Sequence, residues 1–235
     1  MKNTYSNANT LSYDFNVDFA LDKQFIRHNF NRGELRINRE TGGIILVIRW
    51  EYIWIKRWDA KNDWTNTEKD MFHANVNAII SQVWNDKISF SVSGKSDFAK
   101  KFRGKKLPFN IQIIQVERNE HWRVYTYKID NSNPDSFFRS SVSWKSGHIY
   151  IDSKDNVMET KYLDSSNISR KQKGLAHELG HVIGYLVDEY QTGNSDPSAL
   201  MSIGMELRPR YLTAVVENLN KMIYDTNFQI KDVIK

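Results

Sequence analysis

The stretch Ser169-Arg-Lys-Gln-Lys-Gly-Leu-Ala-His-Glu-Leu-Gly-His-Val-Ile-Gly184 carries the strongest structural signal in the chain. Ser169 and Gln172 have the spacing of a capping box, in which the serine oxygen accepts a backbone amide proton and the glutamine reaches back. Gly184 can adopt positive φ and is placed to end a helix. The stretch therefore predicts a helix capped by Ser169 and ended by Gly184, with an apolar face formed by Leu175, Leu179, Val182 and Ile183.

His177, Glu178 and His181 lie within this predicted helix. Residues four apart lie one turn above each other, so both imidazoles can face a single ion. Two neutral imidazoles and one carboxylate suit Zn²⁺ and leave a fourth position for water. Glu178 is aimed beside the ion, where it can take a proton from that water before the water attacks a carbonyl. The motif thus predicts His177 and His181 as zinc ligands and Glu178 as catalytic base. The alternative is three polar side chains on the exposed face of an ordinary helix.

A third ligand is expected soon after the helix, because Gly184 can turn the chain back beneath the metal. Asp188 is the first candidate and Glu189 the second. Glu206, which precedes the last helical region, is a further candidate. Alternatively, Asp188 and Glu189 simply begin a solvated loop.

The run from His177 to Tyr190 resembles the metzincin group of zinc-dependent peptidases, in which a glycine follows the second histidine by three residues. In that group the next ligand follows the second histidine by six residues. Here that position is Val187, and Asp188 comes one residue later. The segment Asp188-Glu189-Tyr190 is closer to bacterial peptidases described as IgA-peptidase-like. The departure in spacing leaves the third ligand open.

A second resemblance lies in Ser198-Ala-Leu-Met-Ser-Ile-Gly204, which is similar to the Met-turn of metzincins, where a methionine forms an apolar floor beneath the metal. By position Met201 takes that role and Met205 is the alternative, although a methionine in a loop can also be core filler. The stretch 201–211 also resembles zinc-peptidase toxin domains of bacterial contact-dependent or contractile secretion systems.

These resemblances cover residues 169–211 and imply a zincin-like zinc metalloendopeptidase with a protein or peptide substrate. The likeness to toxin domains further implies a secreted effector, exported by a dedicated secretion system, with an immunity or inhibitor protein as a partner.

Peptide hydrolysis needs a hydrogen-bond donor for the oxyanion besides the metal. Tyr211 follows the Met-turn-like segment, where zinc peptidases often keep a tyrosine or histidine, so the resemblance implies it as a second catalytic residue. Tyr190 is the alternative, and a core aromatic that begins the last helix explains Tyr211 equally well. Arg208 and Arg210 could bind a substrate carboxylate or be solvated.

The rest of the chain alternates between strand and helix patterns and predicts an α+β fold. We expect a twisted mixed sheet above the motif helix, a backing helix, and a C-terminal helical sub-domain. Residues 1–12 are predicted to be a flexible tail. Residues 13–235 are predicted to be a single zincin-like domain with an upper part at 13–184 and a lower part at 185–235. The expected strands are Ile44–Arg49, Tyr52–Trp58, Ile88–Val92, Phe109–Glu117, His121–Ile129 and Gly147–Ile151, with a hairpin loop at Arg118-Asn119-Glu120, and the expected helices are Lys69–Asn85 and a stripe from Leu212 to Ile223.

Composition excludes several classes of protein. With 40% hydrophobic and 26% charged residues among 235, the chain is neither wholly disordered nor collagen-like. Because it has no cysteine, it has no disulfide, thiolate nucleophile or Cys-ligated metal. No apolar run is long enough to span a membrane, and no Sec-type signal is found, so we expect cytoplasmic synthesis.

Two other functions stay open. The first is a catalytically inactive zincin-fold binding protein whose metal is structural or absent. The second is a basic nucleic-acid-binding module, suggested by the basic loop Lys95–Lys106, although a net charge of +5 makes nucleic acid an unexpected partner.

Overall fold

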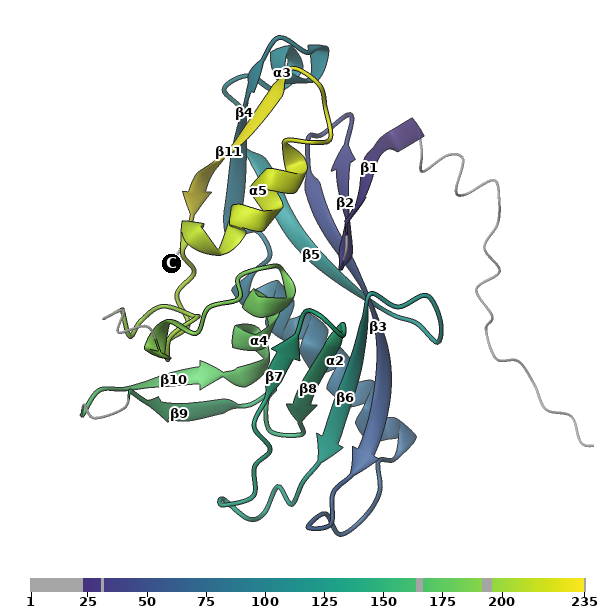
Figure 1. Cartoon of the computed structure of the whole chain (residues 1–235), viewed down its shortest axis with the longest axis vertical. Helices are drawn as coiled ribbons and strands as arrows, with labels where there is room; N and C mark the ends of the chain where they lie inside the picture. The colour runs from purple at the N-terminus through teal and green to yellow at the C-terminus, as the bar shows by residue number, and fades with distance from the viewer. Residues whose placement is uncertain (1–22, 31, 164–166, 192–195, 235) are drawn as a thin grey trace, which may run out of the picture.

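The computed structural model of the protein describes residues 23–30, 32–163, 167–191 and 196–234, so the predicted tail at 1–12 lies outside the described residues. These residues form an α+β fold with one mixed, twisted sheet, a separate two-stranded sheet and a few helices (Figure 1). The order across the main sheet is β11-β4-β5-β3-β6-β8-β7, and β2 and β1 extend it beside the first half of β3. The strands are β1 (Phe25–Phe30), β2 (Gly33–Asn38), β3 (Ile44–Lys56), β4 (Ile88–Gly94), β5 (Leu107–Gln115), β6 (Trp122–Lys128), β7 (Ser141–Ser143), β8 (His148–Asp152), β9 (Met158–Tyr162), β10 (Ser169–Lys173) and β11 (Thr226–Val233). The helices are α2 (Asn66–Val83), α3 (Asp97–Phe102), α4 (Gly174–Val182) and α5 (Thr213–Leu219), with 3-10 turns η1 (Glu189–Gln191) and η2 (Pro209–Leu212).

Strand β3 is the centre of the main sheet. The predicted pair of strands, Ile44–Arg49 and Tyr52–Trp58, is a single strand, because Trp50 and Glu51 between them are not turn-forming residues. β5 pairs in parallel with the first half of β3, and β6 pairs in parallel with the second half on the opposite edge. The hairpin predicted at Arg118-Asn119-Glu120 is therefore wrong: this segment crosses β3, and each flanking strand finds its partner in β3.

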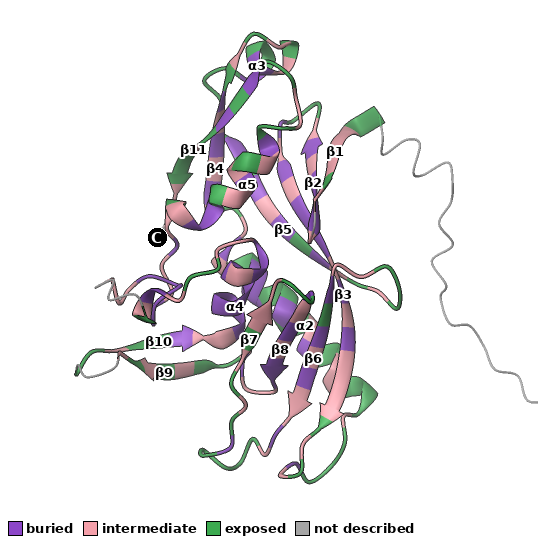
Figure 2. Cartoon of the chain, in the orientation of Figure 1, coloured by how far each residue is buried: buried purple, intermediate pink, exposed green. Residues whose placement is uncertain are grey.

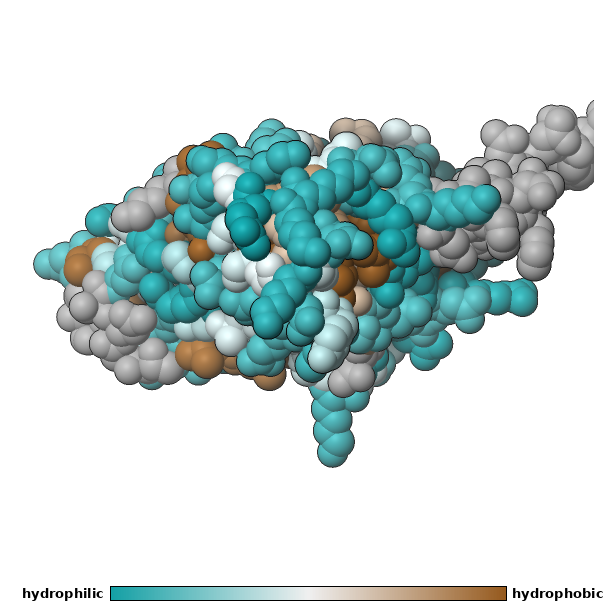
Figure 3. Space-filling view, turned by 90° about the horizontal axis from the view of Figure 1, so that it is seen from above, coloured by the Kyte–Doolittle hydropathy of each residue, from teal (hydrophilic) through white to brown (hydrophobic). Residues whose placement is uncertain are grey.

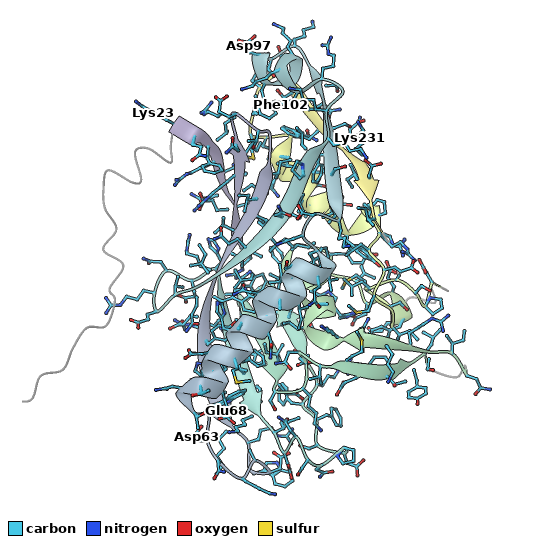
Figure 4. The ribbon with its side chains drawn as sticks, turned by 180° about the vertical axis from the view of Figure 1, so that it is seen from behind. Lys23, Asp63, Glu68, Asp97, Phe102 and Lys231 are labelled. Atoms are coloured by element: carbon cyan, nitrogen blue, oxygen red, sulfur yellow. The ribbon has the colours of Figure 1, made fainter. Side chains whose placement is uncertain are left out.

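Helix α2 crosses the back of the sheet, with Glu68 near its start (Figure 4). It confirms the predicted helix Lys69–Asn85 but begins earlier, because Thr65 and Glu68 form a capping box. The indole nitrogen of Trp84, just after α2, donates to the carbonyl oxygen of Ala176 in α4 at 3.4 Å. The end of α2 thus holds the first turn of α4, which carries the motif.

The capping box predicted at Ser169 is wrong. Residues Ser169–Lys173 form β10, which pairs with β9 in a hairpin that projects beside the main sheet (Figure 1). Helix α4 begins only at Gly174, and the backbone N–H of Leu175 donates to the carbonyl oxygen of Asp155 at 2.9 Å. Gln172 does not cap the helix, because its buried side chain binds the loop below α4.

The C-terminal segment is only partly helical. The stripe predicted from Leu212 to Ile223 is divided between η2 and α5, and α5 ends at Leu219. Strand β11, which was not predicted from the sequence, then pairs antiparallel with β4 at the edge of the main sheet. The predicted helical sub-domain is therefore wrong in this respect: Phe228 is buried in the core shared with the main sheet.

Buried residues follow the strands of the sheet and helix α4 (Figure 2). Seven of the nine residues of α4 are buried, and His177 and Glu178 are among them. Burying polar side chains is costly unless they have partners, so the interpretation of this motif as the exposed face of an ordinary helix is wrong.

The predicted basic loop Lys95–Lys106 contains the short helix α3, at the end of the molecule seen in Figure 3, where hydrophilic side chains dominate. Several of its cations pair with nearby carboxylates, including Lys101 with Glu40 at 3.0 Å and Lys106 with Asp232 at 2.9 Å. Among the described residues, no helix is both long and apolar enough to cross a bilayer.

Candidate metal centre

Helix α4 holds His177 and His181 one turn apart, with ring centroids 5.0 Å apart. The Nδ1 atom of His177 lies 2.8 Å from the carbonyl oxygen of Leu200, and that of His181 lies 2.7 Å from the carbonyl oxygen of Tyr185. A carbonyl oxygen only accepts hydrogen bonds, so each Nδ1 carries a proton and donates it. In the neutral ring, Nε2 then presents a lone pair.

Asp188 completes the group. Gly184 has a φ of 112° and turns the chain at the end of α4. Asp188 Oδ1 lies 3.0 Å from Nε2 of His177 and 3.0 Å from Nε2 of His181. The side-chain amide of Gln191 donates to Asp188 Oδ2 at 2.9 Å and so orients the carboxylate. Of the three candidates for a third ligand, the structure brings Asp188 beside the histidines.

The charges of these groups are strongly coupled. Burial raises the pKa of Asp188, but hydrogen bonds with His177 and His181 outweigh burial and hold that pKa well below its usual range. Burial lowers the pKa of His181, but the hydrogen bond with Asp188 and the nearby Glu178 charge outweigh it and raise that pKa. The three possible ligand atoms lie within 4.8 Å of one another, and either protons on the histidines or a metal ion would balance the charge of Asp188. The group could hold a metal ion.

Glu178 lies beside this group and is 7% exposed. Its Oε2 atom is buried and has no hydrogen-bond partner in the described part of the chain. Burial raises the pKa of its carboxyl group. A buried carboxylate oxygen without a partner is costly, so this atom is open to a further hydrogen-bonding group.

Two cavities adjoin the candidate metal centre, and Glu178 lines both. The first has a volume of about 300 Å³ and extends from the start of α4 towards β9. The second has a volume of about 510 Å³ and lies between α4 and the edge strand β7. Arg139, Ser140 and Tyr190 also line both cavities. No sequence pattern indicated Arg139 or Ser140, because they lie in an irregular segment far from the motif.

Glu189 and Glu206, the alternative third ligands, are engaged elsewhere. Glu189 is 1% exposed and accepts hydrogen bonds from the Tyr185 hydroxyl at 2.9 Å and from the Arg210 guanidinium at 2.5 and 2.7 Å. Glu206 forms an ion pair with Arg208 at 2.9 Å. Arg208 and Arg210, for which substrate binding and simple solvation were both open, instead bind carboxylates of the chain itself.

Met201 lies buried beneath α4, where the resemblance implies a floor residue. A Cβ atom added at Gly180 would overlap the Met201 sulfur, so the methionine packs directly on the helix. Met205, the alternative, accepts the backbone N–H of Lys173 through its sulfur at 3.4 Å. The loop is fixed by the side-chain amide of Gln172, which donates to the carbonyl oxygens of Leu200, Ser202 and Gly204 at 2.9, 3.1 and 2.8 Å. The sequence did not reveal this role of Gln172, because its spacing from Ser169 suggested a capping box instead.

The two candidate tyrosines occupy different environments. Tyr211 is 1% exposed, its hydroxyl accepts the backbone N–H of Met201 at 3.3 Å, and it lines neither cavity. Tyr190 lines both cavities, and its ring centroid lies 6.2 Å from that of His177. The structure therefore places the alternative, Tyr190, beside the candidate metal centre and Tyr211 in the core.

A comparison of the chain with models of protein families, with curated proteins and with solved structures finds no match. Any function assigned to the site therefore depends on its own geometry.

Proposed function

We propose that the chain is a zinc-dependent metalloendopeptidase of the zincin type. The observation that carries the proposal is the convergence of two Nε2 atoms on Asp188 Oδ1, each at 3.0 Å, while both Nδ1 atoms donate to backbone carbonyls. Metal-binding histidines are typically held in this way by a hydrogen bond from the second ring nitrogen. Two nitrogen donors and one oxygen donor suit zinc and leave a position open.

The arrangement of the elements supports the zincin-like assignment. The mixed sheet, α2 on its back and α4 beside its β7 edge correspond in outline to the predicted layout (Figure 1). Met201 beneath α4 agrees with a metzincin-like floor.

In this proposal a bound zinc ion supplies Lewis acidity to a water molecule and to the scissile carbonyl. Glu178 takes the proton from the water, because its carboxylate adjoins both cavities and, among the described residues, no donor competes for Oε2. The same carboxyl group then donates a proton to the leaving amine. The Tyr190 hydroxyl is the oxyanion donor that we favour over Tyr211, because only Tyr190 of the two lines the cavities.

The substrate would bind as an added strand along β7. β7 pairs antiparallel with β8 on one edge, and among the described residues its other edge has no paired strand. Ser141 and Val142 of β7 line the same cavity as Glu178 and His181. An extended peptide on this edge would therefore pass over the candidate metal centre.

The deciding experiment measures bound zinc and peptide cleavage in Glu178→Gln, with Glu117→Gln as the matched control at an exposed position. We expect the wild type and both variants to bind one equivalent of zinc. We expect Glu178→Gln alone to lose cleavage of a peptide library, by about 100-fold or more. If the wild type binds one equivalent of zinc but cleaves no peptide, the result would instead favour a catalytically inactive, zincin-fold binding protein. Export as an effector and an inhibitor partner remain predictions from the resemblance.

A further inference from the structure

The cavity of about 300 Å³ next to Glu178 has an acidic floor that the proposed mechanism does not use. Asp152 and Asp155 are 3% and 7% exposed, and both line this cavity. Its volume is at the lower end of the range for ligand sites, so it suits one side chain rather than a large ligand.

Asp155 is held in place by specific contacts. Its Oδ2 atom accepts the backbone N–H of Asp152 at 2.7 Å and the hydroxyl of Ser140 at 2.5 Å. A Cβ atom at Gly174 would overlap Asp155 Oδ1, so the absence of a side chain at the first residue of α4 makes room for this carboxylate. By contrast, both oxygens of Asp152 accept backbone N–H groups, from Phe138 and Lys154. Asp155 is therefore the floor carboxylate with an oxygen left to bind a ligand.

A second polar group on the cavity wall also lacks a partner. Ser202 is 1% exposed, lines the cavity, and its Oγ atom is buried with no hydrogen-bond partner in the described part of the chain. The backbone of its loop is held by the Gln172 side-chain amide, which donates to the carbonyl oxygen of Ser202 at 3.1 Å. A buried hydroxyl without a partner indicates that a polar ligand group completes the site.

The cations of this cavity lie at its rim. Arg139 is exposed, and Lys161 already pairs with Glu159 at 2.9 Å. Exposed charges are screened by water and salt, whereas a charge on the buried floor is not. A positively charged group that reaches the floor is therefore favoured over a negatively charged one.

We propose that this cavity selects a lysine or arginine side chain of the substrate next to the scissile bond, with Asp155 as the specificity-determining carboxylate and Ser202 as a second acceptor. The inference deepens the proposed peptidase function and rests on it for the identity of the ligand as a substrate. The cation binds Asp155 by a charge-assisted hydrogen bond, which is stronger than a neutral one.

The test compares binding of N-acetyl-arginine amide with that of its uncharged analogue N-acetyl-citrulline amide to the zinc-loaded full chain, by calorimetry. We expect the wild type to prefer the arginine compound by about tenfold or more. Asp155→Asn should abolish the preference, because the amide keeps the size but loses the charge. Ser202→Ala should reduce it. Asp97→Asn, which removes one fully exposed carboxylate far from the cavity, should leave it unchanged.

The same proteins are tested on a peptide library, in which we expect cleavage beside lysine or arginine. Equal binding of the two amides by the wild type, or a preference that survives in Asp155→Asn, would overturn the inference. A charge preference that depends on Asp155 in a protein that cleaves no peptide would support the cation site and refute the peptidase function. Thermal unfolding of each variant verifies that Asp155→Asn is folded, and Ser202→Ala provides an independent test if it is not.

Discussion

The Oδ1 atom of Asp188 lies 3.0 Å from Nε2 of His181, although the carboxylate is in a loop and the imidazole in a helix. The turn at Gly184, with a φ of 112°, brings them together. A Cβ atom at this glycine would also come within 2.7 Å of the Ala214 Cβ, so both backbone conformation and packing restrict the turn. The candidate site thus depends on one backbone reversal.

Replacing Asp188 by alanine should weaken zinc binding by at least about 100-fold, because loss of a direct ligand should cost no less than loss of an outer hydrogen-bond partner. The measurement is zinc competition with a chromophoric chelator at pH 7. Glu206→Gln is the control, because Glu206 pairs with Arg208 rather than with the histidines. If Glu206→Gln weakened zinc binding as much as Asp188→Ala, the assignment of the third ligand would be wrong.

The candidate site can be predicted from the sequence more fully than the sheet can, because its main residues are close together in the chain. His177, Glu178 and His181 lie within two turns of one helix, so local geometry determines how they face each other. The same holds for α2, whose apolar residues repeat at helical spacing. Asp188 could be ranked first as the third ligand, but the sequence alone could not separate it from Glu189 and Glu206, because the path of the chain after Gly184 depends on packing against the C-terminal segment.

The predictions that the structure contradicts concern strands that pair with residues far away in the sequence. β5 and β6 both pair in parallel with β3. From the sequence alone, the short segment between them resembles a hairpin loop, because the pairing with β3 is not visible there. β11 presents polar side chains on its outer face, and its place at the edge of the main sheet is set by its pairing with β4 and by burial of Phe228. Asp152 and Asp155 become functional candidates only when folding places them beside the start of α4. Cross-strand contacts of this kind leave no periodic pattern in the sequence.

The two tyrosines should respond differently to removal of their hydroxyl groups. Tyr190→Phe should lower kcat for peptide cleavage by about 100-fold with little change in KM, because it removes an oxyanion donor. Tyr211→Phe should leave kcat unchanged and lower the free energy of unfolding by about 1 kcal/mol, because the Met201 N–H loses its acceptor. Steady-state kinetics, zinc content and urea unfolding of both variants test this. A larger kcat loss in Tyr211→Phe would restore Tyr211 as the catalytic tyrosine.

Arg210→Ala should destabilise the protein by about 2–4 kcal/mol, because it removes the guanidinium that makes two hydrogen bonds to the buried carboxylate of Glu189. The control is Arg123→Ala, which removes a more exposed ion pair with Glu51 and should cost distinctly less, because water and salt screen exposed charges. The free energies of unfolding come from urea titrations. If the free energy of unfolding fell by a similar amount in the two variants, the ion pair of Arg210 with Glu189 would contribute no more than an exposed one.

Asp155 should make stability depend on pH. Burial, the neighbouring Asp152 and, to a smaller extent, Glu178 raise its pKa from 3.8 to about 7, although hydrogen bonds from Ser140 and the Asp152 backbone oppose the rise. Because the pKa is higher in the folded state than in the unfolded state, folding holds the proton more tightly. Its contribution is therefore most favourable below pH 4 and is lost as the pH rises to about 7. A shift of this size corresponds to a penalty on the order of 4 kcal/mol once the group is ionised.

Asp155→Asn removes this penalty, so its stability relative to the wild type should increase by on the order of 2 kcal/mol between pH 5 and pH 8. Urea unfolding across this range, with a chelator present so that metal binding adds no pH dependence, measures the difference. Asp97→Asn, which removes one fully exposed carboxylate far from the cavity, is the control for the loss of a single negative charge. A difference between Asp155→Asn and the wild type that stays constant from pH 5 to pH 8 would mean that Asp155 ionises in the folded protein as readily as in the unfolded chain.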